Sequence, residues 1–167
     1  YCFMYRKKLI YPSTAAVYEP FSSPYATSKY FAEEAIRDLL PSSVILRLFN
    51  VYGKGIKEKS GSLFWRFLND KHIKVYGRGN HTRDFINIED VANIIKESFK
   101  KKWNGKTVDV GTGKGVSIGV LADIFAKERG VYIIYHSPRK EIKESKADIK
   151  LLKKLYKKPL VTDIRKD

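Results

Sequence analysis

A chain of 167 residues with 43% hydrophobic residues is long enough to bury a core, and this composition is that of a globular protein. No apolar run reaches the ~20 residues of a membrane helix. A single cysteine excludes an internal disulfide and a multi-cysteine zinc site. The net charge of +15 suggests nucleic-acid binding, but the lysines are scattered along the whole chain, which favours a basic, solvated surface.

The start of the chain does not have the order of a signal peptide. Residues 1–5 are apolar, but the basic residues follow them instead of preceding them. We therefore expect a cytoplasmic protein with no metal site, no nucleic-acid partner and no membrane partner.

In the first part of the chain, strands and helices are expected to alternate. A short strand over residues 9–11 should end at Pro12. A helix over residues 24–40 should follow, because Ser23 is a good N-cap, proline fits the first helical position, and Pro41 stops the helix. A second strand is expected over residues 44–49 and a second helix over residues 61–69.

The same alternation continues to the end of the sequence. Strands are expected over residues 73–76 and 84–87, followed by an amphipathic helix over residues 88–101 and a strand over residues 107–110. Ser117 should cap a helix that ends before Gly130. A strand over residues 131–135 follows, and Ser145 with Asp148 resembles a capping box before a last helix that reaches about residue 157.

This alternation predicts an α/β fold with a parallel sheet. A complete doubly wound nucleotide-binding domain needs two βαβαβ halves. The chain has room for one half and a small extra lobe, and no glycine-rich nucleotide-binding turn opens it.

The chemistry is expected in Thr14, Tyr25 and Lys29. A tyrosine and a lysine four residues apart lie on one face of a helix. A tyrosine phenol, with an ordinary pKa of about 10, is a poor base until a nearby ammonium lowers that pKa. With a hydroxyl bound to the same reacting oxygen, such a pair could remove a proton from a sugar hydroxyl, and hydride would go to a nicotinamide cofactor.

The Y-x-x-x-K pattern alone is weak, because eleven tyrosines and many lysines would give about one or two matches by chance. On the simpler interpretation, Tyr25 is a partly buried aromatic residue and Lys29 a surface charge. The order of the elements favours the catalytic interpretation, since Thr14 ends a strand and Tyr25 and Lys29 open the next helix.

A series of sequence blocks makes the interpretation more specific. In chain order they are PSTAAVY (12–18), PYATSK (24–29), LRLFNVYG (46–53), VYGRGNHTRDF (75–85), DVGTG (109–113), PRKEI (138–142) and SKAD (145–148). Through this series the chain resembles the extended short-chain dehydrogenase/reductase family, in its NAD-dependent nucleotide-sugar epimerase/dehydratase branch.

The resemblance implies a role for each candidate. Thr14, Tyr25 and Lys29 would be the catalytic set, and Tyr25 and Lys29 would also contact NAD. Leu48 and Phe49 would line the nicotinamide side. The residues that would bind the nucleotide-sugar substrate are Asn50, Arg83, Arg139, Glu141 and Ser145.

Two of the substrate residues and a glycine-containing turn also have simpler interpretations. Arg83 could form a surface ion pair with Asp84. Asn50 could satisfy backbone groups of a loop, and the glycines of residues 111–113 could only make a turn.

The resemblance also implies a fold and a division of the chain. The fold would be the C-terminal half of a Rossmann-like parallel sheet with a small α/β substrate-binding lobe. Residues 1–52 and about 82–110 would belong to the sheet, about 53–81 and 111–157 to the lobe, and 158–167 to a tail.

The likeness favours epimerisation over dehydration. Dehydratases of this family carry an acid and a base directly after the threonine, where this chain has Ala15 and Ala16. We therefore expect 4-epimerisation of a nucleotide sugar, as between UDP-glucose and UDP-galactose, through a 4-keto intermediate. Ser145 stands where some relatives have a bulky residue, which suggests room for N-acetylated sugars.

The chain departs from the family in two places. The glycine-rich N-terminal unit that binds the NAD pyrophosphate is absent from this sequence, and the loop over residues 19–24 is shorter than in relatives. Catalysis is therefore expected to need a separate N-terminal half, and a non-catalytic nucleotide-sugar-binding remnant is the alternative. Relatives dimerise through the helix that begins at Pro24, so a homodimer is expected. A basic nucleic-acid binder would instead show salt-sensitive binding.

Overall fold

The computed structural model describes residues 1–55, 62–139, 142–162 and 164. Its helices are α1 (Pro24–Leu39), α2 (Leu63–Asn69), α3 (Ile88–Ser98), α4 (Ile118–Arg129) and α5 (Lys150–Leu155). Its strands are β1 (Ile10–Thr14), β2 (Val44–Leu48), β3 (Asn50–Tyr52), β4 (Ile73–Tyr76), β5 (Thr82–Asn87), β6 (Thr107–Val110), β7 (Gly115–Ser117), β8 (Ile133–His136) and β9 (Glu144–Ser145). The predicted α/β class is confirmed.

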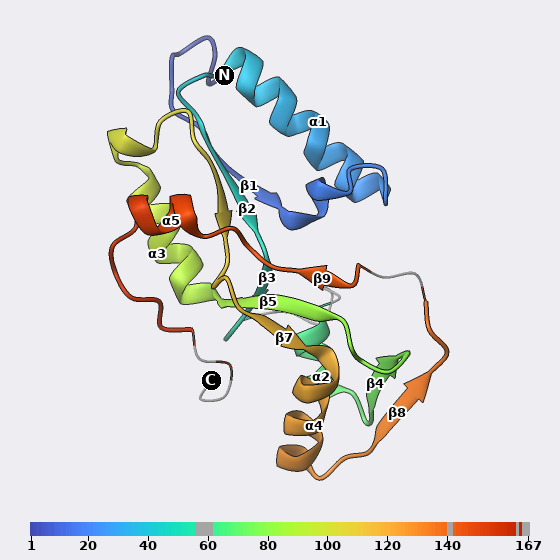
Figure 1. Cartoon of the computed structure of the whole chain (residues 1–167). Helices are drawn as coiled ribbons and strands as arrows, with labels where there is room; N and C mark the ends of the chain where they lie inside the picture. Colours follow the sequence, from blue (N-terminus) through green and yellow to red (C-terminus); the bar gives the residue numbers. More distant parts are fainter. Residues whose placement is uncertain (56–61, 140–141, 163, 165–167) are drawn as a thin grey trace.

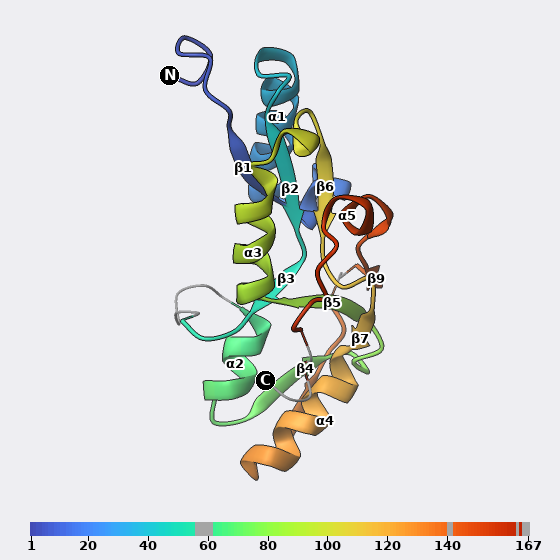
Figure 2. The ribbon, with the colours of Figure 1, turned by 90° about the vertical axis from the view of Figure 1, so that its left-hand side faces the viewer.

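A parallel sheet forms one end of the elongated molecule (Figure 1). Its strand order is β1-β2-β6, and Thr14 and Leu48 are register partners at the carboxyl ends of the first two strands. The helices α1 and α3 lie on opposite sides of this sheet in Figure 1. Figure 2 shows α5 beside β6. The first sheet therefore has the helix-covered faces that a parallel sheet requires.

A second sheet lies across the middle of the molecule. In it β5 pairs in parallel with β3 and β9 and antiparallel with β7. A further pair, β4 and β8, is parallel and lies with α2 and α4 at the other end of the molecule (Figures 1 and 2). The strand β5 thus joins segments that are far apart in the sequence.

Two hydrophobic cores correspond to the two ends of the molecule. The first contains Val44, Leu46, Ile86, Val91, Ile94, Trp103, Val108, Val110, Leu152, Leu155 and Tyr156. The second contains Tyr52, Phe64, Phe67, Ile73, Val75, Phe85, Ile118, Leu121, Ala122 and Phe125. Whether the cores correspond to the predicted division into a Rossmann-like part and a substrate lobe stays a prediction.

The helix ends follow the capping residues that the sequence indicates. Ser23 accepts a hydrogen bond from the Ala26 N–H and Pro24 takes the first helical position, so α1 begins as predicted. Ser117 caps α4 in the same way. Gly130 ends α4 with a φ of 64°, in the left-handed region that glycine adopts without a steric penalty.

Several predicted boundaries are wrong. The first strand continues through Pro12 to Thr14, because β1 is an edge strand of the described sheet, where proline is tolerated. The helix α3 ends at Ser98, before a separate 3-10 turn over Lys101–Trp103. The short strands β7 and β9 were not expected, because two or three residues carry no measurable periodicity.

The predicted capping box before the last helix is also wrong. Ser145 pairs with Arg83 as part of β9 and is not a cap. The helix α5 begins later, at Lys150, whose N–H donates to the Asp148 carboxylate at 3.1 Å. Among the described residues, no helix is long and apolar enough to cross a membrane.

Candidate active site

A cavity of about 320 Å³ lies where β5 meets the second core. Its described lining residues are Asn50, Leu63, Arg66, Lys74, Tyr76, His81, Arg83, Ile118 and Arg139. Four of these side chains are cationic, and none of the described lining residues is a carboxylate. The cavity is therefore suited to an anionic ligand, and guanidinium groups favour phosphate in particular.

Two of the predicted substrate residues reach this cavity from neighbouring strands. Asn50 begins β3 and Arg83 lies on β5. The Asn50 amide donates to the Asp84 carbonyl at 3.1 Å, so the simpler interpretation, in which Asn50 satisfies backbone, describes part of its role. The Arg83 guanidinium donates to the carbonyls of Thr82 and Ile142 at 2.9 and 2.8 Å.

The suggested surface ion pair of Arg83 with Asp84 is wrong. Asp84 is fully buried, and its carboxylate accepts hydrogen bonds from Thr112, Gly113 and Ala147. The two side chains point to opposite faces because successive residues of a strand alternate. The expected turn at residues 111–113 is present, and Asp84 holds it.

Arg139 completes the set of predicted residues at the cavity. Its guanidinium carbon lies 3.9 Å from the centre of the Tyr76 ring, a cation–π contact between the segment after β8 and the end of β4. Ser145 does not line the cavity but is the register partner of Arg83. Glu141 lies outside the described residues.

Sequence analysis missed four polar or aromatic residues of the cavity: Arg66, Lys74, Tyr76 and His81. Arg66 lies on α2, and its buried Nε has no hydrogen-bond partner among the described residues. An arginine among the apolar residues of α2 is a feature of the sequence that indicates a candidate functional residue. That feature alone does not tell whether the side chain turns to solvent or to a cavity.

The three predicted catalytic residues lie on β1 and α1. Thr14 ends β1, and its hydroxyl accepts a hydrogen bond from the Ala16 N–H at 3.2 Å. Tyr25 lies in the first turn of α1 with 56% of its surface exposed. The Lys29 ammonium donates to the Pro12 carbonyl at 2.9 Å and lies 4.6 Å from the centre of the Tyr11 ring. Lys29 therefore contacts β1, the strand that ends at Thr14.

The two residues expected at the nicotinamide face the interior of the chain. Leu48 packs against the first core, and Phe49 is only 7% exposed. Because Leu48 pairs with Thr14 and Asn50 follows two residues later, the catalytic and substrate candidates begin at the same end of the sheet. Open parallel sheets bind their ligands at this carboxyl end.

A buried ionic cluster that sequence analysis missed connects the catalytic elements. Glu33 on α1 is fully buried and accepts hydrogen bonds from Ser13 at 2.5 Å and from Arg47 at 2.8 Å, and Arg37 also contacts it. Burial acts to raise the pKa of Glu33, but the hydrogen bonds from Arg47 and Ser13 and the nearby guanidinium charges outweigh it and hold the pKa below its ordinary value.

A second hydrogen-bonded pair adjoins this cluster and involves Tyr18, which follows Thr14 in the chain. The Tyr18 hydroxyl donates to the Asp109 carboxylate at 2.7 Å, and Arg47 lies over the Tyr18 ring. Burial raises the pKa of both groups; the hydrogen bond with Asp109 raises that of Tyr18 further, whereas the same bond from Tyr18 acts to lower that of Asp109. The turn after Thr14 is therefore fixed to β6.

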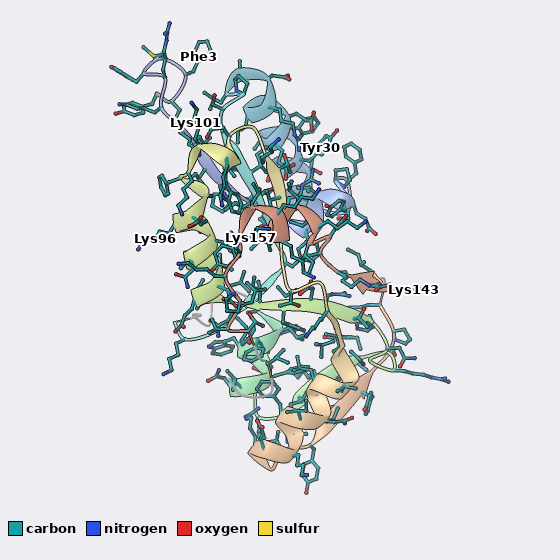
Figure 3. All side chains as sticks on the ribbon, turned by 60° about the vertical axis from the view of Figure 1, so that its left-hand side comes forward. Phe3, Tyr30, Lys96, Lys101, Lys143 and Lys157 are labelled. Carbon is teal, nitrogen blue, oxygen red and sulfur yellow. The ribbon has the colours of Figure 1, made fainter. Side chains whose placement is uncertain are left out.

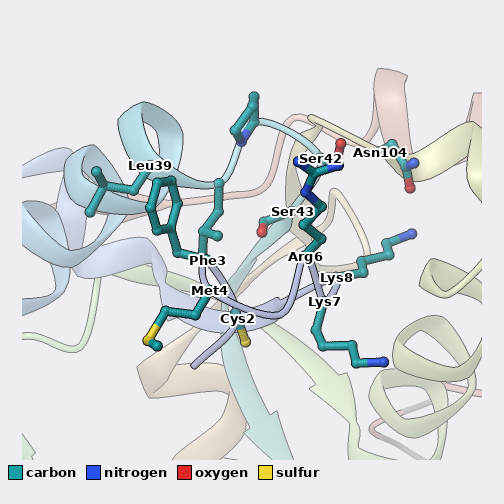
Figure 4. Close-up of a pocket in the computed structure, with 12 residues that line it drawn as sticks. Cys2, Phe3, Met4, Arg6, Lys7, Lys8, Leu39, Ser42, Ser43 and Asn104 are labelled. Carbon is teal, nitrogen blue, oxygen red and sulfur yellow. The ribbon is translucent and has the colours of Figure 1, made fainter.

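A larger hollow of about 770 Å³ lies elsewhere, beside the first eight residues (Figure 4). It is lined by residues that include Phe3, Met4 and Leu39, and none of the predicted site residues that the structure describes reaches it. Charge does not separate the two cavities, because Arg6, Lys7 and Lys8 also line the hollow, but only the smaller cavity is lined by residues predicted to bind the substrate. The smaller basic cavity is therefore the better candidate despite its size.

The positive charge is spread over separate elements. Figure 3 shows Lys96 and Lys143 on opposite sides of the view, with Lys101 and Lys157 in other parts of the molecule. Among the described residues, no group of three or more His, Cys, Asp or Glu side chains could hold a metal ion.

Comparison with known proteins identifies the family to which the chain is similar. A model of the family described as "NAD dependent epimerase/dehydratase family" matches residues 2–111. A protein of Methanocaldococcus jannaschii with the provisional name UDP-glucose 4-epimerase is 36% identical over 149 residues, which cover 82% of this chain and 48% of that protein. The chain spans about half the length of the curated relatives it matches.

Solved structures show the same fold. Pal from Bacillus thuringiensis superposes with a TM-score of 0.87 at 26% identity, over 98% of this chain and 61% of that chain. A UDP-N-acetylglucosamine 4-epimerase from Methanobrevibacter ruminantium, in complex with UDP-N-acetylmuramic acid, gives a TM-score of 0.78 at 29% identity, over 95% and 59%. This chain belongs to the NAD dependent epimerase/dehydratase family.

Proposed function

We propose that this chain carries the catalytic residues and the substrate side of an NAD-dependent nucleotide-sugar 4-epimerase. The observation that carries the proposal is the basic cavity into which Asn50, Arg83 and Arg139 converge from three separate segments. These three residues are 33 and 56 positions apart in the sequence, and the fold brings them to one cavity.

In this proposal the cavity binds the diphosphate of the nucleotide sugar. Arg83 and Arg139 offer planar guanidinium groups that can bind two phosphate oxygens each. Arg66 supports the same ligand chemistry, because a buried guanidinium nitrogen without a partner costs free energy until an acceptor binds it. Asn50 is oriented by its bond to the Asp84 carbonyl.

Tyr25, Lys29 and Thr14 then act on the sugar. The Tyr25 oxygen takes the proton of the 4-hydroxyl, the Thr14 hydroxyl hydrogen-bonds the same sugar oxygen, and the Lys29 ammonium stabilises the negative charge that develops. NAD, when bound, supplies the hydride acceptor that the side chains lack. Tyr25 is exposed at the start of α1, so that it is accessible to a bound nicotinamide. Residues outside this sequence would hold the NAD pyrophosphate.

Two features support epimerisation of an N-acetylated sugar within this family. Ala15 and Ala16 follow Thr14, and alanine cannot transfer the proton that dehydration needs. Ser145 is small and lies beside Arg83 in the pairing of β9 with β5. We therefore propose UDP-N-acetylglucosamine as an accepted substrate.

The proposal is tested by calorimetric titration of the chain with UDP-N-acetylglucosamine and with NAD, followed by an epimerase assay on the same sample. Arg83→Gln should weaken UDP-sugar binding by about tenfold, because it removes a charge-assisted hydrogen bond. Arg78→Gln is the matched control, since Arg78 is exposed and does not line the cavity.

The outcomes separate the alternatives. UDP-sugar binding with NAD-dependent turnover supports an epimerase. Binding without turnover, even when residues that bind the NAD pyrophosphate are supplied, would support a non-catalytic binding remnant. Absence of UDP-sugar binding, or an equal loss in both variants, would remove the cavity as the substrate site.

A further inference from the structure

Asp84 is a fully buried carboxylate that no step of the proposed reaction uses. Its Oδ1 accepts hydrogen bonds from the Thr112 N–H at 2.8 Å and the Thr112 hydroxyl at 2.6 Å. Its Oδ2 accepts from the Gly113 N–H at 2.8 Å and the Ala147 N–H at 3.1 Å. One side chain on β5 therefore binds two segments that are distant in the sequence.

The packing beside this carboxylate is close at Gly111. A Cβ atom placed on Gly111 would lie 2.7 Å from the Asp84 carboxylate and 2.7 Å from the Ala147 Cβ. Only glycine fits between the two, because real Cβ atoms do not approach other atoms this closely. The turn after β6, the strand β5 and the segment at Ala147 are thus held in one arrangement.

Two of these segments, β5 and the segment at Ala147, lead to residues of the cavity or its edge. The Asp84 carbonyl accepts from the Asn50 amide. Arg83 is its neighbour in the chain and points to the other face of the strand. The segment bound through Ala147 also contains Ser145, the register partner of Arg83, and the Ile142 carbonyl that accepts from the Arg83 guanidinium at 2.8 Å.

We propose that Asp84 is a positioning residue for substrate binding: its carboxylate fixes the segment that contains Ile142 and Ser145, and thereby sets the orientation of Arg83 at the cavity. This inference rests on the proposed function, since it assumes that the cavity binds the nucleotide sugar. Without the carboxylate, three N–H groups and a hydroxyl lose their acceptor, and the segment can leave β5.

The structure offers a matched control in Asp90. That side chain is also buried, and its carboxylate accepts from the Val161 N–H, the Thr162 N–H and the Thr162 hydroxyl. It joins α3 to the C-terminal segment and does not line the cavity. Asp84→Asn and Asp90→Asn therefore remove comparable hydrogen bonds, but only the first loosens the cavity.

The experiment measures the Kd of UDP-N-acetylglucosamine and of UDP-glucose by calorimetry for the wild-type chain and both variants, well below the unfolding temperature of each. We expect Asp84→Asn to raise the Kd by about tenfold and to change the ratio of the two affinities, with Asp90→Asn staying within about twofold. A role in folding alone would lower the Tm of Asp84→Asn and leave both the Kd and the ratio unchanged.

A second variant tests the positioning role of Asp84 if Asp84→Asn does not fold. Thr112→Val removes one of the two donors to Oδ1 and is expected to raise the Kd in the same direction by a smaller factor. Wild-type affinity in a folded variant, or equal effects at Asp84 and Asp90, would overturn the positioning role alone. A wild-type chain that binds neither UDP-sugar would overturn the proposed function and this inference with it.

Discussion

At the scale of single residues, the buried carboxylate of Glu33 connects the elements that carry the catalytic candidates. It lies on the same helix as Tyr25 and Lys29, and it binds Ser13, which directly precedes Thr14. The Lys29 ammonium makes a second contact from α1 to this strand, at Pro12. Because two neighbouring strand residues are bound, α1 cannot slide along β1 without breaking both hydrogen bonds, of which the one between Ser13 and Glu33 is buried.

Glu33→Gln should lower the free energy of unfolding by about 3 kcal/mol, because it leaves the Arg47 guanidinium without its buried charge partner. The pKa of Glu33 is depressed in the folded state. Its stabilising contribution is therefore complete above the ordinary value of about 4.3 and is lost as the pH falls through the lower folded value. Urea denaturation at pH 7 and at successive lower pH values measures both effects.

Glu34→Gln is the control for this prediction. Glu34 also pairs with Arg37, but its side chain is 47% exposed, so its loss should cost less than about 1 kcal/mol. An equal loss of stability in the two variants, or an unchanged acid dependence in Glu33→Gln, would contradict the role assigned to the buried carboxylate.

At the scale of elements, the start of α1 determines where Tyr25 lies. The Ser23 hydroxyl accepts from the Ala26 N–H at 3.2 Å, one residue beyond Tyr25. Ser23→Ala should lower the free energy of unfolding by about 1 kcal/mol. Ser22→Ala, at an exposed neighbouring serine, should change it by less than about 0.5 kcal/mol. Chemical denaturation of both variants tests the cap, and similar losses would show that it contributes nothing specific.

Elements with strong local signals could be predicted from the sequence, and short ones could not. Capping residues and periodicity located α1 and α4 almost to the residue. The strands β7 and β9 exist because β5 pairs with them, so their signal lies in tertiary contacts. The side chains of the cavity also meet only through tertiary contacts. Arg83 and Arg139 were predicted through the resemblance, whereas Arg66 was not, because its role depends on which way α2 faces.

At the scale of the whole molecule, α1 leaves apolar side chains in contact with water. Phe31 and Leu39 are each 58% exposed and lie eight residues apart on this helix, which places them on one side. We propose that this side is the interface of a homodimer. Sedimentation should show a dimer that Phe31→Asp dissociates, whereas Phe99→Asp, at an exposed phenylalanine outside α1, should leave it intact. A monomeric wild-type chain would contradict the proposal.

The proposed site combines residues from the two ends of the molecule, and Thr14, Tyr25 and Lys29 do not themselves line the basic cavity. The carboxyl end of the parallel sheet supplies Thr14, while Arg83 and Arg139 come from the part built around the second core. The catalytic and the substrate-binding candidates therefore belong to different parts of the molecule, and β5 with its buried Asp84 connects them.

The most direct test of this account is a crystal structure of the chain grown with saturating UDP-N-acetylglucosamine. The account predicts that the diphosphate lies in the basic cavity, within hydrogen-bond distance of the Arg83 and Arg139 guanidinium groups, with the sugar directed toward Thr14 and Tyr25. A nucleotide sugar bound in the hollow beside the first eight residues, or a basic cavity that stays without ligand, would contradict it.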